Sequence, residues 1–171
     1  PQNLEDIIAG ISLYRPGPMD FIPKYIKGKN NHDEITYSCP ELEPILSPTY
    51  GCIVYQEQVM QIVCDLGCYT MGRSDLVRRA MSKKKQSVME KERANFVYGN
   101  PEEGVPGCVA RGIPEKVGLE IYAEMMDFAK YAFNKSHAAC YAVVAYQTAY
   151  LKYCYPVEFM ASLMTSVIDN P

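Results

Sequence analysis

Cationic side chains are the residues of this sequence best suited to binding chemistry, and their densest group lies between residues 78 and 93. This stretch reads RRAMSKKKQSVMEKER, with seven Lys and Arg against two Glu. On a helix of about 3.6 residues per turn, Arg78 and Arg79 point about 100° apart, whereas Arg79 and Lys83 share one face. Either both arginines bind oxygens of one polyphosphate, or one binds phosphate while the other anchors the helix. A solvated basic face is the alternative interpretation.

A second polar group, the NKSH segment (Asn134, Lys135, Ser136 and His137), stands at the start of a long predicted helix. Ser136 can cap that helix, because its hydroxyl can accept a hydrogen bond from a free backbone N–H. The segment therefore places a cation and several donors beside the positive end of the helix dipole. This arrangement is suited to binding phosphate. An ordinary capped helix start is the alternative.

Four further residues are candidates for the same kind of site. Arg15 lies in the RPGP turn, where two prolines around a glycine fix the backbone and can hold the side chain in one direction. Tyr55 and Gln56 stand at a predicted strand-to-helix junction, where side chains are often displayed for binding. Lys84 continues the lysine run. The alternatives are a rigid turn with a solvated arginine and a plain hydrogen-bonded junction.

Helical spacing of apolar residues dominates the chain that must position these groups. We predict a mainly α, multi-helix domain with at most one short strand pair, and a short extended run at 50–55. The predicted helices, taken from that spacing and from capping residues, are one that follows Asn3 and those at 56–66, 72–82, 86–98, 114–130, 136–153 and 157–167. Residues 19–27 form a short amphipathic segment, and 40–46 a helical turn.

Several positions within these elements carry specific predictions. Gly67 should supply the stop after helix 56–66. Leu76, Val77 and Ala80 should face inward. The glycine-rich and proline-rich segment 99–113 should be an exposed loop and is a candidate mobile tip.

Small and aromatic side chains form two stripes on the long helix 136–153. Their members, which we expect to pack in a core, are the alanines Ala138, Ala142, Ala145 and Ala149 and the tyrosines Tyr146, Tyr150 and Tyr153. If buried, the tyrosine hydroxyls would need hydrogen-bond partners.

Composition limits the class of protein. The 171 residues, with 48% of them hydrophobic, suffice for one domain with a real core, and we expect the sequence to be a piece of a longer chain. A net charge of −3 excludes a uniformly basic coat, so a polyanion would meet a local patch. Seven cysteines without paired spacing indicate reduced thiols rather than a disulfide framework.

The sequence offers little sign of a metal site or a membrane segment. It contains no D-x-D motif, and the pairs Cys64/Cys68 and His32/Cys39 fall short of four metal ligands. No apolar run reaches the roughly 18 to 20 residues of a membrane span, and no signal peptide opens the chain. We therefore expect no metal in this chain, no membrane partner and a cytoplasmic location.

Blocks of sequence along nearly the whole chain closely resemble one known family, the bacterial replicative C-family DNA polymerases, in the fingers region of their DNA polymerase III alpha subunits. The blocks occur in the family's order and are YRPGPM (14–19), YGCIVYQEQVMQI (50–62), DLVRRAMSKKK (75–85), FNKSHAACYA (133–142), YQTAYLK (146–152) and PVEFMASL (156–163).

The resemblance implies a helical fingers domain that closes over the incoming nucleotide. It implies that catalytic aspartates and Mg²⁺ belong to a palm domain outside this chain. The family's paired fingers arginines, which are similar to Arg78 and Arg79, would meet the triphosphate, with Lys83 beside them. Asn134, Lys135 and His137 would line the nucleotide and template side of the active site.

The function implied is that of part of a DNA-directed DNA polymerase, a nucleotidyltransferase of DNA replication, and the isolated piece should be inactive. The expected partners are dNTP, DNA primer-template, the remaining domains of the same chain and other replicase subunits. The alternative is a non-catalytic helical nucleic-acid-binding module, with lysines and arginines on phosphates and tyrosines stacked on bases. A third hypothesis is a protein-interaction scaffold.

Overall fold

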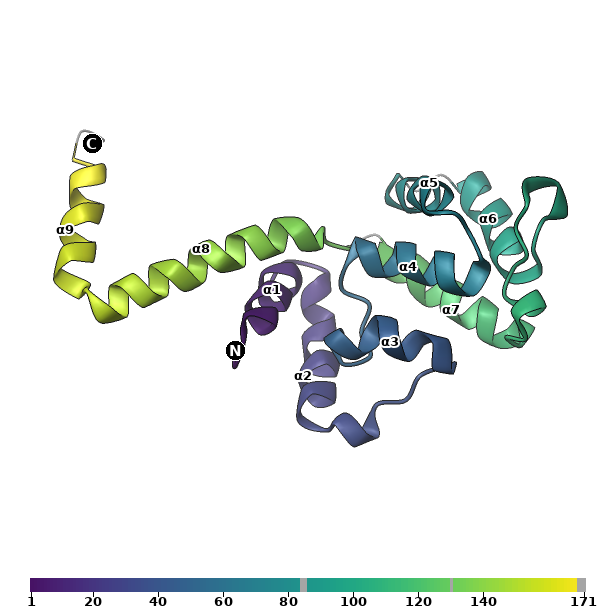
Figure 1. Ribbon diagram of the computed structural model, residues 1–171, viewed down its shortest axis with the longest axis horizontal. Helices are drawn as coiled ribbons and strands as arrows, with labels where there is room; N and C mark the ends of the chain where they lie inside the picture. The colour runs from purple at the N-terminus through teal and green to yellow at the C-terminus, as the bar shows by residue number, and fades with distance from the viewer. Residues whose placement is uncertain (84–85, 130, 169–171) are drawn as a thin grey trace. The chain divides into compact units, whose positions relative to one another are not determined.

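Helices make up most of the protein, which is seen here in a computed structural model that describes residues 1–83, 86–129 and 131–168 (Figure 1). The α-helices of the described part are α1 (Leu4–Leu13), α2 (Ile22–Asn30), α3 (Glu43–Leu46), α4 (Gln56–Gly67), α5 (Met71–Ser82), α6 (Gln86–Tyr98), α7 (Glu115–Ala129), α8 (Lys135–Cys154) and α9 (Pro156–Ser166). Extended pairing in the same residues is limited to isolated bridges, Tyr55 with Phe133 and Asn100 with Val105. The prediction of a mainly α fold with at most one short strand pair is confirmed.

The chain divides into two compact units. The larger comprises Ser12–Lys135, and the smaller combines Pro1–Ile11 with Ser136–Pro171. The boundaries fall near the end of α1 and in the first turn of α8. The larger unit therefore contains α2 to α7, and the smaller one contains most of α1 together with α8 and α9.

Helix α4 is the centre of the larger unit. It packs against α3, α5, α6 and α7. Its buried apolar residues recur every three or four positions, so they form one continuous face, and they are Val59, Ile62, Val63 and Leu66. Phe96 from α6 and Met125 from α7 are fully buried members of the same core. A helix covered on several sides is a rigid base for groups at its ends.

The start of α4 is fixed by Gln58, and its end differs from the prediction. The Gln58 side-chain oxygen accepts from the N–H groups of Val54 and Tyr55 at 2.8 and 3.0 Å, as the third residue of a capping box does. Gly67 is the last helical residue, and Cys68 is the one in the left-handed region, with φ 57°. The left-handed stop predicted at Gly67 therefore lies one residue later, and a Cβ on Gly67 would lie 2.8 Å from the Phe96 ring. Gly67 serves close packing.

Helix α5 buries Val77 and Ala80, as predicted, but Leu76 is exposed. The buried face of α5 also includes Ser74, and Leu76 lies about 100° from Val77 around the helix axis. The inward orientation predicted for Leu76 was therefore wrong, because hydrophobicity alone does not define which side of a short helix meets its neighbours.

The segment 99–113 packs back onto the core instead of lying exposed along its length. Val105, Cys108 and Ile113 are buried members of the core. Asn100 and Val105 exchange two backbone hydrogen bonds of 2.7 and 2.9 Å, and the Cys108 N–H donates to the Phe96 carbonyl at 2.8 Å. The prediction of an exposed loop was wrong at these positions, because apolar residues between the glycines have a core to cover. Its mobility stays a prediction.

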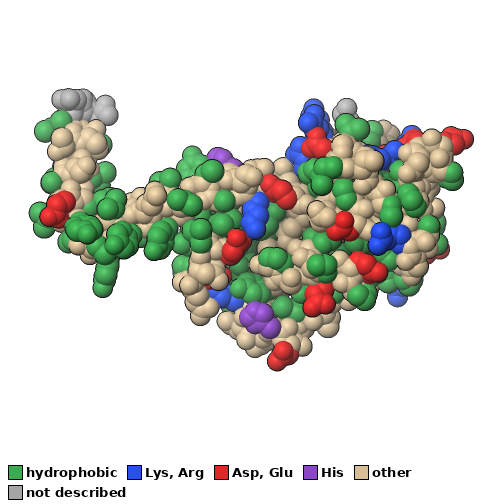
Figure 2. Space-filling view, in the orientation of Figure 1, with side chains coloured by type: hydrophobic (Ala, Val, Ile, Leu, Met, Phe, Trp, Pro, Cys, Tyr) green, Lys and Arg blue, Asp and Glu red, His purple; other side chains and the backbone are tan. Residues whose placement is uncertain are grey.

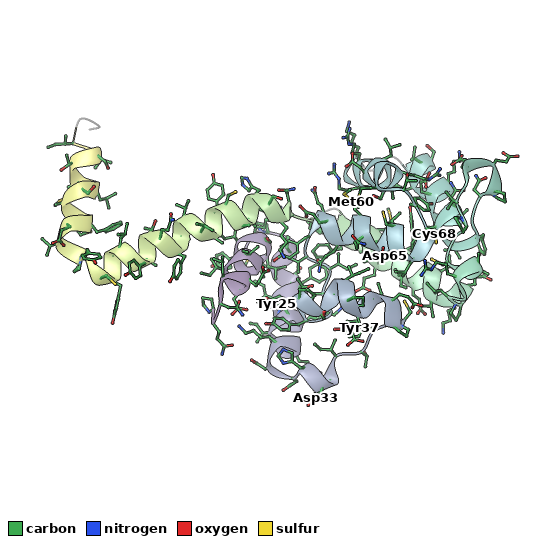
Figure 3. The ribbon with its side chains drawn as sticks, viewed as in Figure 1. Tyr25, Asp33, Tyr37, Met60, Asp65 and Cys68 are labelled. Carbon is green, nitrogen blue, oxygen red and sulfur yellow. The ribbon has the colours of Figure 1, made fainter. Side chains whose placement is uncertain are left out.

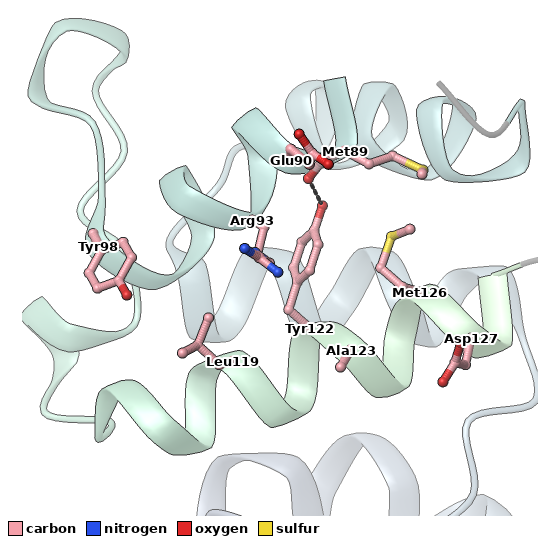
Figure 4. A pocket seen from close by; sticks show the side chains of 9 residues that line it. All are labelled: Met89, Glu90, Arg93, Tyr98, Leu119, Tyr122, Ala123, Met126 and Asp127. Carbon is pink, nitrogen blue, oxygen red and sulfur yellow. Dashed lines mark hydrogen bonds between the residues drawn. The ribbon is translucent and has the colours of Figure 1, made fainter. Parts of the chain in front are cut away.

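Helices α6 and α7 enclose a groove of about 510 Å³ (Figure 4). Tyr122 of α7 crosses it, and its hydroxyl donates to the Met89 carbonyl of α6 at 2.9 Å. Burial raises the pKa of this Tyr122 hydroxyl above its ordinary value. Arg93 lies beside the Tyr122 ring, and Asp127 lines the groove further along α7. The hydrogen bond fixes the spacing of the two helices.

The smaller unit begins with a capped helix. The Asn3 side-chain oxygen accepts from the Asp6 N–H at 2.9 Å, as predicted. Helix α8 begins at Lys135, so Ser136 is its second residue, two positions further in than the capping position predicted for it.

Most of helix α8 is exposed, although core packing was predicted for two of its stripes. Ala138 and Ala142 are buried, whereas Ala145, Ala149 and the three tyrosines are exposed. Core packing was therefore wrong for most of both stripes, because the burial on this 20-residue helix is confined to its first turns. Hydrophobic side chains line the surface of α8 and α9 (Figure 2). The described helices all fall short of the combined length and hydropathy that crossing a bilayer requires.

Candidate functional site

The first turn of α4 is where distant parts of the larger unit meet. The Gln56 N–H donates to the Phe133 carbonyl at 2.9 Å, and the Phe133 N–H donates to the Val54 carbonyl at 3.3 Å. These two bonds form the parallel bridge at Tyr55. They bring the residues just before α8 beside the N-terminus of α4.

Helix α5 presents the arginine pair, joined by the carboxylate of Asp75. Arg78 donates to Asp75 Oδ1 from Nε at 2.9 Å and from Nη2 at 2.7 Å. Arg79 donates to the other oxygen, Oδ2, from Nε at 2.7 Å. The hydrogen bonds from Arg78, together with the charges of both arginines, lower the pKa of Asp75 below its usual value. One carboxylate thus holds both guanidiniums.

The two arginines differ in what else they touch. Arg78 Nη1 donates to Gln56 Oε1 at 2.9 Å, and Gln56 Nε2 donates to the Ala132 carbonyl at 3.1 Å. The Arg78 side chain is 24% exposed, whereas that of Arg79 is 62% exposed. Of the two arrangements predicted for the pair, the geometry favours Arg78 as the anchor and Arg79 as the residue open to a ligand.

Asn134 and Lys135 meet the same turn of α4 through Glu57. The Asn134 side-chain amide donates to Glu57 Oε1 at 3.0 Å, and the Lys135 N–H donates to both carboxylate oxygens at 3.1 Å. Lys135 Nζ lies 5.3 Å from the centre of the Tyr55 ring. Glu57 therefore binds at the N-terminus of α8, where the sequence predicted an anion site.

The remaining candidates fall in different places. Tyr55 is buried, with Gln56 beside it hydrogen bonded at both ends, as in a plain structural junction. Lys83 is exposed one turn beyond Arg79, whose carbonyl accepts from its N–H at 3.0 Å. Lys84 lies outside the described residues. His137 belongs to the smaller unit, where its ring centroid is 4.7 Å from that of Tyr141.

Arg15 is directed inward by the RPGP turn. Its Nε donates to the Ser12 carbonyl at 3.0 Å, its Nη2 donates to the Tyr131 carbonyl, and its guanidinium lies 4.7 Å from the centre of the Phe133 ring. Burial lowers the pKa of Arg15 from its ordinary value. Arg15 therefore holds the main chain that leads to the NKSH segment.

Two residues central to this geometry were missed from the sequence. Asp75 stands three and four positions before the arginines, a spacing that signals helical ion pairs and could have been recognised. Glu57 gave no such signal, because its partners are distant in sequence and meet it only through tertiary structure. Asp75 and Glu57 are the acidic partners of the two cationic stretches.

The residues that the structure describes do not fit a metal site. Within the described ranges, no three His, Cys, Asp or Glu side chains are grouped so that they could hold an ion. The site at α4 and α5 is instead built from guanidinium, amide and ammonium groups. Groups of this kind bind anionic oxygens and orient them, with arginine favouring bidentate contacts.

Comparison with known proteins gives one consistent match. A family model described as "Bacterial DNA polymerase III alpha subunit finger domain" matches residues 1–104. Proteins named DNA polymerase III subunit alpha from Halalkalibacterium halodurans, Borreliella burgdorferi and Thermus aquaticus are 47%, 45% and 48% identical over 171, 170 and 170 residues. The alignments cover 100%, 99% and 96% of this chain but only 15%, 14% and 13% of those proteins.

Proposed function

Because the chain belongs to the finger-domain family of the bacterial DNA polymerase III alpha subunit, we propose that it binds the triphosphate of an incoming dNTP within a DNA-directed DNA polymerase. The observation that carries this proposal is the arginine pair of α5. Arg79 is largely exposed and is held by Asp75, beside the anchored Arg78. A guanidinium directed in this way is suited to phosphate oxygens.

Transfer of a nucleotide from a dNTP requires cationic groups that position the triphosphate and neutralise its charge. A dNTP carries several negative charges, and catalysis of its reaction depends mainly on positioning and on charge neutralisation. Arg79 supplies a fork of N–H donors, and the exposed Lys83, just after the end of α5, supplies a second positive charge one turn further along the chain. In this proposal Asn134, Lys135 and His137 serve the nucleotide and template side.

The chemical step belongs elsewhere in the parent polymerase. The chain spans about 15% of the relatives it matches, and its described residues group no metal ligands. In this proposal the catalytic aspartates and Mg²⁺ belong to a palm domain outside this chain. Primer-template, the other domains of the parent, further replicase subunits and the cytoplasm complete the proposed setting.

The proposal is tested in the full-length polymerase with an Arg79→Ala variant. Loss of a charge-assisted hydrogen bond should cost roughly 1 to 3 kcal/mol. The value of kcat/KM for dNTP should therefore fall by about 5- to 150-fold. Arg111→Ala is the matched control, because Arg111 is exposed and contacts Cys68 rather than the arginine pair. Steady-state primer extension measures both variants.

Two results would contradict the proposal. Unchanged incorporation kinetics in both Arg78→Ala and Arg79→Ala would remove the pair from the nucleotide site. Template-dependent synthesis by the isolated chain, free of other polymerases, would contradict the assignment of the chemistry to a separate palm domain.

A non-catalytic nucleic-acid-binding module is the second candidate, and the exposed tyrosines of α8 favour it. Tyr146, Tyr150 and Tyr153 are available for stacking on bases. Such a module would bind DNA by itself with a steep dependence on salt. A DNA-binding titration of the isolated chain at several salt concentrations separates the candidates, because an isolated finger domain should bind only weakly.

A further inference from the structure

We propose that Asp75 is a positioning residue that directs Arg79 toward the triphosphate. This inference rests on the proposed function of the arginine pair. The carboxylate accepts from Arg78 through Oδ1 and from Arg79 through Oδ2. In this proposal Asp75 acts through Arg79 and does not contact the nucleotide itself.

The fixed side of this arrangement is Arg78. It is bound twice to Asp75 and once to Gln56, which is bound in turn to the Ala132 main chain. An exposed acid on a helix normally moves with its partner and orients little. Here the carboxylate has one oxygen held by an anchored guanidinium, so its other oxygen is a fixed acceptor for Arg79.

The free side is Arg79. Its Nε is taken by Asp75. In the described part of the chain, the ion pair of Arg79 is with Asp75 and is made from Nε, and the side chain remains largely exposed. The guanidinium therefore keeps its end-on pair of nitrogens for two oxygens of a phosphate. Holding Nε beforehand removes side-chain freedom that binding would otherwise have to remove.

Two roles of Asp75 predict opposite effects of its removal on dNTP binding, so the direction of the measured change distinguishes them. Asp75 places a negative charge beside two positive ones. If it only neutralised them, its removal would raise the local positive charge and strengthen the binding of an anionic triphosphate. If it positions Arg79, its removal should weaken nucleotide use even though the local charge becomes more favourable.

The test uses the full-length polymerase with Asp75→Asn, which keeps the size of the side chain. We expect the KM for dNTP to rise and kcat/KM to fall by about 10-fold, because a displaced binding group loses most of its effect. Asp75→Glu keeps a carboxylate and should restore part of the loss. The matched control is Asp65→Asn on α4 (Figure 3), where Asp65 accepts from Gln61 and has no link to the arginines.

Double variants with Arg79→Ala show whether Asp75 acts through Arg79. Adding Asp75→Asn to Arg79→Ala should cause no further loss, since the residue being positioned is already gone. A merely structural role for Asp75 would instead add its loss to that of Arg79→Ala. Asp75→Ser provides a second variant if Asp75→Asn fails to fold.

The outcomes separate this inference from the proposed function. Two results would overturn the role of Asp75 alone, provided that Arg79→Ala is impaired. One is an Asp75→Asn effect that adds to that of Arg79→Ala. The other is a KM for dNTP that is unchanged or lower in the Asp75→Asn single variant. Normal kinetics in both arginine variants overturn the proposed function and this inference together. A rise in KM that disappears in the Arg79→Ala background supports both.

Discussion

The two units of the protein treat similar side chains in opposite ways. In the larger unit Leu66 is fully buried and Tyr122 is 2% exposed, whereas in the smaller unit Leu151 is 46% exposed and Tyr153 is 88% exposed. All four stand on regular helices with apolar neighbours. A helical apolar pattern therefore indicates that a residue can be covered, but it does not say that its own chain covers it.

The difference has a physical meaning for α8 and α9. Large apolar side chains exposed along them include Val144, Leu151, Val157 and Met164. Contiguous exposed apolar surface of this kind is typical of sites that contact another protein. This pattern favours the interaction hypothesis for the smaller unit, while the larger unit has a core of its own.

The strongest test of this contrast pairs Leu66→Ala with Leu151→Ala. Leu66→Ala leaves a cavity in the core and should lower the free energy of unfolding by about 2 to 5 kcal/mol. Leu151→Ala removes a partly exposed side chain and should change it by less than about 1 kcal/mol. Urea titration of the 171-residue chain measures both. Equal losses would show that the smaller unit has a core like that of the larger one.

A second pair tests how far the core of the larger unit extends into segment 99–113. Gly99 and Gly104 both have positive φ, so alanine should cost roughly 1 to 2 kcal/mol at either position. At Gly99 the new Cβ would also lie 2.2 Å from the Pro106 carbonyl oxygen, whereas at Gly104 it meets nothing within 4 Å. Gly99→Ala should therefore be clearly the more damaging in thermal unfolding. Similar melting temperatures would contradict the packed arrangement.

The smallest effect on stability is expected from polar substitutions on the smaller unit. Val144→Ser, Leu151→Ser and Met164→Ser together should change the free energy of unfolding little, by about 0.5 kcal/mol for each exposed site. They should nevertheless reduce self-association of the isolated chain, which static light scattering measures. Association that is unaffected by the triple variant would mean that this apolar surface does not drive it.

Local signals predicted most of the fold. Pro156 opens α9, Asn3 caps α1, and the predicted bounds of the helix 86–98 coincide with those of α6. These features depend on neighbours in sequence. The errors at Gly67 and Leu76 depend on Phe96 and on the side of α5 that meets other helices, which a local pattern does not contain.

In the candidate site, too, some features depend on neighbours in sequence and others on tertiary contacts. The basic run and the NKSH segment stand out by composition and by helix position, so they could be found in the sequence. Their connection could not, because it is made by Gln56 and Glu57, adjacent residues that bind Arg78 and Asn134 from distant parts of the chain. Only the folded main chain brings those partners together.

The bridge between Tyr55 and Phe133 also bears on how nucleotide binding would be transmitted. Two main-chain bonds, the Gln56 amide and the Glu57 carboxylate fasten the first turn of α4 to residues 132–135. In the proposed site, a ligand on Arg79 would be linked through Asp75, Arg78 and Gln56 to the main chain of Ala132, just before α8. The first turn of α4 therefore connects α5, which carries the arginine pair, to residues 132–135 at the start of α8.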